Sequence, residues 1–204
     1  MRGGYDRGME LTRGALVLLL ALGVSGCGQP EDFESEIGAW RADKDAYMRS
    51  SDSPVEPAER RDYPPLNYYP VQQDYRVPAA LKLVESKDIL ELPTSQNLRR
   101  QMRRIGYLQF RLKGELLTLT AFMDAAEPDR RRLFVPFGDL TNGNETYTGG
   151  RYLDLSRTAT DIYDLDFNRA YLPFCVYNPK YDCPLPPREN RMKTFVRAGE
   201  RMPH

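Results

Sequence analysis

Apolar residues recur along the chain in three patterns, and each pattern predicts a different kind of element. From about residue 31 to residue 49 they return at helical spacing, which predicts one amphipathic helix. From about residue 75 onward they alternate with polar residues, as in residues 107–112, and this alternation is typical of half-buried strands. Residues 15–22 are apolar throughout and are the third pattern.

Turn signals divide the alternating part of the chain at intervals of roughly ten residues. They include Gly114 and the Asn142-Gly143 step, which favours a hairpin. The pattern predicts strands near residues 75–84, 106–113, 115–123, 131–140, 161–167 and 193–200. The predicted fold is therefore all-β: an antiparallel sandwich or barrel-like domain over residues 33–204, with one N-terminal amphipathic helix.

The apolar run at residues 15–22 is too short to cross a bilayer as a stable helix. It follows a weakly basic stretch and leads into Val24-Ser25-Gly26-Cys27, which resembles a bacterial lipobox. This arrangement predicts a signal peptide over residues 1–26, lipid on Cys27 and a tether over residues 27–32. The alternative is an ordinary signal peptide in which the cysteine is incidental.

The predicted lipid makes the membrane the first expected partner of the chain. The expected location is the cell envelope, and in a Gram-negative host it is the periplasmic face of the outer membrane. Because 29 basic residues balance 29 acidic residues and no long basic block occurs, no nucleic acid is expected to bind.

A single histidine, His204, stands at the end of the chain. Its position argues against a Ser-His-Asp triad, a Cys-His pair and a His-ligated zinc site. We therefore expect no metal and no cofactor. Any general acid or base would have to be an Asp, Glu, Tyr, Lys or Cys side chain.

Cys175 and Cys183 have seven residues between them. A disulfide is open to them in an oxidising compartment, and two buried free thiols are the main alternative. A metal site would need two more soft ligands, and a nucleophile would lack a histidine base. The sequence leaves these alternatives open.

Five stretches stand out as motifs: "WRADKD", "LFVPFGDLTNGNETYTGGRYL", "LDFNRAY", and "CPLPPRENR" followed by "AGE". The last two blocks are long and unusual in composition. Through them the chain, from Trp40 to Glu200, resembles the domain of unknown function 1684 family of bacteria and archaea. In that family the run after "AY" usually reads Asn-Pro, whereas Leu172 stands here in place of the asparagine. The family has no established activity, so the resemblance implies a fold and no mechanism.

Polar side chains gather near the predicted strand ends and around the proline-rich stretch at 183–187, and the arginines and carboxylates among them can form forked ion pairs. We expect them to line a site for a small polar or anionic ligand; they are Arg151, Asp166, Asn168, Tyr171, Glu189, Asn190 and Arg191. A buried structural network is the alternative role for the same groups. Arg41, Lys44 and Asp45 of the predicted helix are further candidates.

Three functions remain open from the sequence. The first is a membrane-anchored module that binds a small ligand. The second is an envelope hydrolase that uses Asp166 and Glu189 as a carboxylate pair. The third is a partner-binding or structural lipoprotein.

Overall fold

The computed structural model describes residues 32–85, 88–126 and 132–203. The predicted signal peptide and Cys27 lie outside the described residues. The first described element is helix α1, Phe33–Met48, which confirms the predicted amphipathic helix. None of the described helices is long and apolar enough to cross a membrane.

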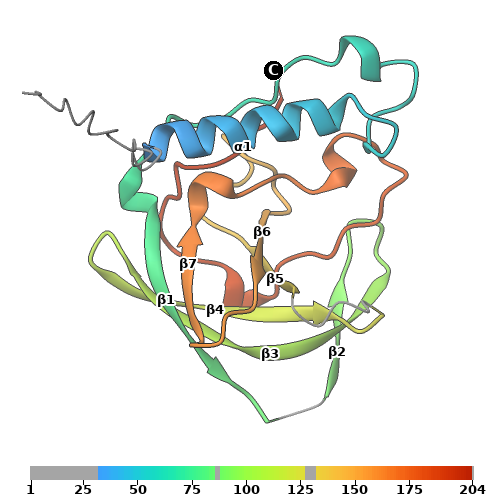
Figure 1. The fold of residues 1–204 in the computed structure, drawn as a ribbon. Helices are drawn as coiled ribbons and strands as arrows, with labels where there is room; N and C mark the ends of the chain where they lie inside the picture. Colours follow the sequence, from blue (N-terminus) through green and yellow to red (C-terminus); the bar gives the residue numbers. More distant parts are fainter. Residues whose placement is uncertain (1–31, 86–87, 127–131, 204) are drawn as a thin grey trace, which may run out of the picture. The chain divides into compact units, whose positions relative to one another are not determined.

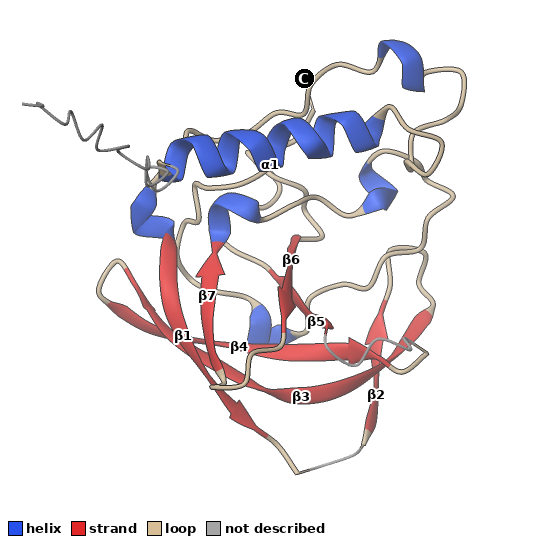
Figure 2. Cartoon of the chain, in the orientation of Figure 1, coloured by secondary structure: helices blue, strands red, loops and turns tan. Residues whose placement is uncertain are grey.

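In the part of the chain that the structure describes, seven antiparallel strands follow α1 and form one sheet. They are β1 (Arg76–Leu83), β2 (Ile89–Pro93), β3 (Arg99–Leu112), β4 (Glu115–Asp124), β5 (Arg132–Phe137), β6 (Arg151–Ser156) and β7 (Ile162–Asp166). Their order is β6-β5-β4-β3-β1-β7, and β2 pairs with the first part of β3. The sheet curls into a nearly closed barrel (Figure 2), which confirms the all-β prediction.

The sheet bends at the middle of β3, the longest strand. The pairing of β3 with β4 shifts register between Arg104 and Gly106, as at a β-bulge. At Gly106 an added Cβ would lie 2.4 Å from the carbonyl oxygen of Lys82, so only glycine allows β1 to approach this closely. The first half of β3 is then free to pair with β2.

The main core fills the inside of the curled sheet, because alternate residues of each strand point inward. Leu108, Leu119, Leu133 and Leu165 are each fully buried there. A second, smaller cluster, which includes Met102 and the partly buried Phe134, lies at the other end of β3 to β5. This separate cluster supports the candidate site described below.

Helix α1 lies across the ends of β1 and β7 in Figure 1. Glu36 of α1 forms ion pairs with Arg76 at the start of β1 and with Arg169 just after β7. Further along α1, the Lys44 ammonium lies 2.7 Å from a carboxylate oxygen of the buried Glu200. The helix is therefore fixed at both ends by side chains that are distant in sequence.

The predicted strand at residues 193–200 is wrong, because this segment is irregular. Its alternation is real, since Val196, Ala198 and Glu200 are all buried. Their carbonyl oxygens, however, accept hydrogen bonds from the guanidinium of Arg151 at 2.6, 2.5 and 3.1 Å. A side chain thus takes the place of a neighbouring strand.

A second side chain substitutes for pairing between β4 and β5. Phe122 and Phe134 pair across these strands, and in that register Thr120 stands opposite Pro136, which has no N–H to donate. The amide of Asn190 bridges the gap. It accepts from the Thr120 N–H at 2.7 Å and donates to the carbonyls of Thr120 and Pro136 at 2.9 and 2.7 Å.

The Asn142-Gly143 step lies within the long connection between β5 and β6, which do form an antiparallel pair. Gly143 has a φ of +87°, which favours glycine. The N–H of Gly143 donates to the carbonyl of Thr146 at 2.9 Å and closes a local turn. The step therefore makes a turn inside the loop, and does not join the two strands directly.

Candidate functional site

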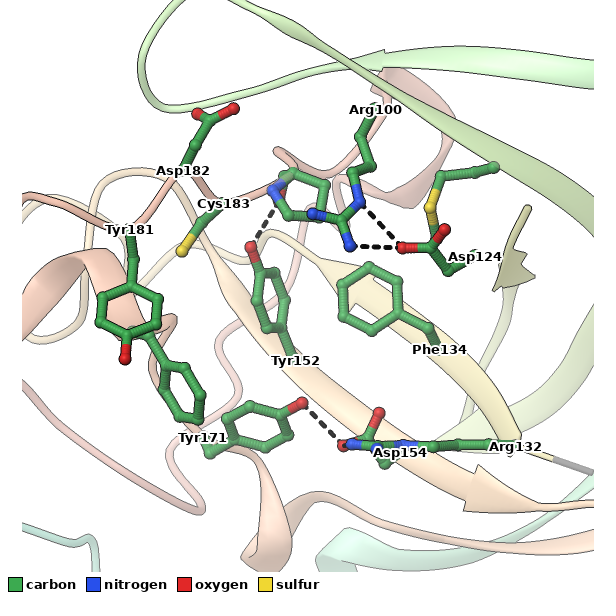
Figure 3. A pocket seen from close by; sticks show the side chains of 13 residues that line it. Arg100, Asp124, Arg132, Phe134, Tyr152, Asp154, Tyr171, Tyr181, Asp182 and Cys183 are labelled. Atoms are coloured by element: carbon green, nitrogen blue, oxygen red, sulfur yellow. Dashed lines mark hydrogen bonds and ion pairs between the residues drawn. The ribbon is translucent and has the colours of Figure 1, made fainter. Parts of the chain in front are cut away.

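A cavity of about 300 Å³ opens where the ends of four consecutive strands meet the segment 171–184. The strands β3 to β6 contribute Arg100, Met102, Asp124, Arg132, Phe134, Tyr152 and Asp154. The segment contributes Tyr171, Phe174, Tyr181, Asp182, Cys183 and Pro184. Figure 3 shows the labelled side chains around this space, which we call the aromatic cavity.

Aromatic rings form the wall of the cavity. Tyr152 meets Phe134 edge to face with ring centroids 4.6 Å apart, and meets Tyr171 in the same way at 5.6 Å. Phe174 and Tyr181 form another edge-to-face pair at 5.4 Å. Such contacts fix ring orientation and leave a rigid apolar surface.

Two arginine–aspartate pairs stand among the rings. Arg100 donates to Asp124 at 2.8 and 2.5 Å, and Arg132 donates to Asp154 at 2.6 Å. Each pair joins neighbouring strands, and each arginine is about half exposed. The cavity therefore presents donors and acceptors side by side, beside an apolar wall.

Tyr171 connects the aromatic wall to one of these pairs. Its hydroxyl donates to Asp154 at 2.7 Å (Figure 3). Burial, reinforced by the nearby Asp154 carboxylate, raises the pKa of Tyr171 well above its ordinary value. Burial likewise raises the pKa of Tyr152, whose hydroxyl donates to the carbonyl of Pro184 at 2.5 Å. Both phenols thus remain protonated donors at neutral pH.

Lys44 of α1 packs against the ring of Tyr171. Its ammonium lies 4.5 Å from the centre of the Tyr171 ring and ion-pairs with Glu200. Glu200 also accepts hydrogen bonds from the Tyr177 hydroxyl and from the Leu172 amide. This buried cluster sets the position of the segment that closes the cavity.

The structure does not gather the seven predicted site residues in one place. Tyr171 lines the aromatic cavity, whereas Arg151 and Asn190 are fully buried and hold the backbone as described above. Asn168 is also fully buried, and its side-chain amide bonds the N–H and carbonyl of Gln72. The alternative role, as part of a buried structural network, is therefore the one the structure gives to these three.

The remaining predicted residues have separate surroundings. One oxygen of Asp166 accepts from the backbone and side-chain N–H groups of Asn168, and the other lies 3.6 Å from Arg169. Glu189 is half exposed and lies 3.7 Å from Arg104. Asp166 lines a cavity that Glu189 does not line. The two carboxylates are therefore not placed as a catalytic pair.

Arg191, the last of the seven, lines a third cavity beside Gly138 and Asp139. Of the further helix candidates, Arg41 donates to the carbonyl of Tyr69 and Asp45 accepts from the amide of Leu66. Only Lys44 reaches a residue of the aromatic cavity.

Cys175 and Cys183 are both free thiols in this structure. The amide of Cys175 donates to the sulfur of Cys183 at 3.2 Å, and Cys183 belongs to the cavity wall. Among the described residues, no three His, Cys, Asp or Glu side chains gather as a metal site would need.

Most residues of the cavity were not predicted from the sequence, although the sequence holds one pattern that points to them. The four charged residues on the strands follow in the order Arg100, Asp124, Arg132 and Asp154, so the sign alternates from each strand to the next. Opposite charges on adjacent strands are a known pairing preference. This pattern can be recognised only when the register of the strands is known, because the register decides which charged residues face each other.

The fold and the cavity define a small antiparallel β-barrel protein with an aromatic-walled cavity closed by one C-terminal segment. The family model described as "Protein of unknown function (DUF1684)" matches residues 61–201, and the chain belongs to this family. A search of curated proteins gives no match.

One solved structure resembles the chain closely in both sequence and fold. It is the solution NMR structure of an uncharacterized protein of Haloarcula marismortui, which is 41% identical. The match covers 84% of this chain and 95% of the archaeal chain, with a TM-score of 0.66. The shared fold therefore extends over nearly the whole of that protein.

Proposed function

We propose that this chain is a lipid-anchored binding protein of the cell envelope that holds a small, ring-shaped, polyhydroxylated ligand in the aromatic cavity. The observation that carries the proposal is the combination of rigid aromatic walls with two arginine–aspartate pairs whose arginines are about half exposed. A cavity of about 300 Å³ is at the small end of the range for ligand sites, which suits a monosaccharide-sized molecule.

The polar groups match hydroxyl groups better than they match a charged ligand. A hydroxyl can donate to Asp124 while it accepts from Arg100, and the second pair repeats this arrangement. Because the lining has two arginines and three aspartates, its formal charge is minus one. The anionic ligand considered from the sequence is therefore less well matched than a neutral sugar-like ring.

The same geometry favours binding over hydrolysis. A glycosidase needs a carboxylic acid that is kept protonated by an apolar environment, beside a second free carboxylate. Asp124 and Asp154 instead each lie within 2.6 Å of an arginine. The hydroxyls of Tyr171 and Tyr152 stay protonated and already donate to Asp154 and to the Pro184 carbonyl, so neither is placed to transfer a proton to a ligand.

Replacement of Tyr181 by alanine is expected to weaken binding of a neutral monosaccharide about tenfold. Tyr181 is 38% exposed at the cavity, and removal of one stacking ring costs about 0.5–1.5 kcal/mol in addition to the lost burial. Isothermal titration calorimetry with glucose, galactose and mannose, beside their uronic acids, measures the effect.

Tyr107→Ala is the matched control, because Tyr107 lies on β3 and does not line the cavity. The control should bind as the parent does, and the neutral sugars should bind more tightly than the uronic acids. Equal losses in both variants, or no binding by any of these sugars, would contradict the proposed ligand class.

The anchor is a separate part of the proposal and is supported by Val24-Ser25-Gly26-Cys27. Mass spectrometry of the native protein should find an acylated Cys27 at the mature N-terminus. Cys27→Ser should move the protein from the membrane fraction to the soluble fraction, because several acyl chains are needed for stable anchoring. An unmodified Cys27, or a variant that stays in the membrane fraction, would refute the anchor.

A further inference from the structure

Two thiols meet at the edge of the aromatic cavity. Cys175 lies in the short 3-10 helix Phe174–Val176, and Cys183 lies at the cavity wall, labelled in Figure 3. The Cys175 amide donates to the Cys183 sulfur at 3.2 Å, which places that sulfur directly beside the Cys175 backbone. Neither cysteine forms a disulfide in this structure.

The backbone around Cys183 is held in place. The Cys183 N–H donates to the Ser95 hydroxyl at 3.0 Å, and its carbonyl accepts from the Ser95 N–H at 2.9 Å. On the other side, the Asn178 side chain donates to the carbonyl of Pro54 at 2.9 Å and anchors the loop between the two cysteines. The two thiols are thus brought together before any bond forms.

The two sulfurs differ in their surroundings. Cys175 is partly exposed, and hydrogen bonds from the Cys183 thiol and from the hydroxyls of Ser95 and Tyr147 lower its pKa to about 6. Cys183 is 7% exposed, and its pKa is raised because its thiol donates to Cys175 and is buried. Asp182 adds a smaller effect in the same direction.

This asymmetry indicates that Cys175 is the reactive thiol and that Cys183 is a protonated thiol that can react after it. A partly exposed sulfur stabilised as thiolate is the nucleophile in thiol–disulfide exchange, and a nearby protonated thiol can complete the reaction. The difference in exposure between the partly exposed Cys175 and the buried Cys183, whose sulfur lies against the Cys175 amide, supports these separate roles.

We propose that Cys175 and Cys183 form a dithiol site that reduces low-molecular-weight disulfides, with Cys175 as the attacking sulfur and Cys183 as the resolving sulfur. The Cys175 thiolate attacks one sulfur of the disulfide, forms a mixed disulfide and releases the first thiolate, which takes up a proton. Cys183 then loses its proton and attacks the Cys175 sulfur, which releases the second thiol. Starting from the Cys175 thiolate and the Cys183 thiol, the protein loses two electrons and one proton. With one further proton from solvent, the disulfide becomes two thiols.

The test uses the full chain with Cys27→Ser, so that only these two cysteines can react, and glutathione disulfide as the probe. The intact mass should show the loss of two hydrogens with no retained glutathione. Adding Cys183→Ser should trap one glutathione on Cys175. Adding Cys175→Ser instead should slow the reaction at pH 7 by at least about tenfold, because an ordinary or buried thiol is mostly protonated there.

A second measurement tests the proposal on the unaltered pair. The rate of alkylation by iodoacetamide should rise with pH and reach half of its maximum near pH 6, since the thiolate of Cys175 is the reacting form. A half-maximum near the ordinary cysteine value would overturn the proposal. So would a Cys183→Ser variant that takes up no glutathione, or a parent that keeps both thiols reduced. None of these results depends on whether a sugar binds in the cavity.

Discussion

Replacement of Arg151 by methionine is expected to lower the free energy of unfolding by about 3–5 kcal/mol. Arg151 is fully buried, and its guanidinium lies 2.9 Å from the buried carboxylate of Asp139. The substitution leaves that carboxylate without its counter-ion and leaves three carbonyls of the C-terminal segment without a donor. A loss of this size is a large fraction of the stability of a small domain.

Urea unfolding measures this effect, and Arg197→Met is its matched control. Arg197 pairs with Glu145 at the same distance, 2.9 Å, but half of its side chain is exposed. The control should therefore unfold close to the parent's midpoint. Arg151→Lys keeps a charge and some donors, so it should fall between the two. Equal midpoints for Arg151→Met and Arg197→Met would contradict the structural role of Arg151.

Replacement of Asn190 by aspartate is expected to lower the free energy of unfolding by about 2–6 kcal/mol, although the two side chains have nearly the same shape. The change replaces the donating NH₂ group by an oxygen that faces the carbonyls of Thr120 and Pro136. Each buried acceptor that loses its donor costs about 1–3 kcal/mol. Hydrogen exchange should also become faster at the β4–β5 boundary.

Asn144→Asp is the control for this prediction, because Asn144 is exposed. It should change neither the urea midpoint nor the exchange rates. If Asn190→Asp were as stable as Asn144→Asp, the amide of Asn190 would not be what joins β4 to β5.

The strands were predictable where the alternation of side chains and the hydrogen bonding of the backbone agree. At β1, β3, β4, β5 and β7 they agree, and the predicted elements are present. At residues 193–200 the side chains alternate but the backbone bonds to Arg151, and no local pattern reveals a partner that distant in sequence. Two strands, β2 and β6, were not predicted, and β2 is short and pairs with the extended first half of β3.

The candidate site was less predictable than the fold. Sequence reasoning selected charged and amide side chains in unusual stretches. Several of them, such as Asn168 and Asn190, form hydrogen bonds to backbone groups of other segments in the structure. The cavity instead uses single charged residues at strand ends, such as Arg100 and Asp124, which look like ordinary surface positions in the sequence. They line one cavity only because the strand register brings them beside the segment 171–184.

The most direct test of the proposed function is an NMR titration of the ¹⁵N-labelled protein with the neutral monosaccharide that binds most tightly. The binding proposal predicts saturable shifts of amide signals at residues 99–102, 122–124, 132–134, 152–154 and 171–184, which surround the aromatic cavity. Signals near the cavity lined by Gly138 and Arg191, which shares no residue with the aromatic cavity, should stay unchanged. Shifts centred on that second cavity, or none at saturating sugar, would contradict the proposal that the aromatic cavity is the binding site.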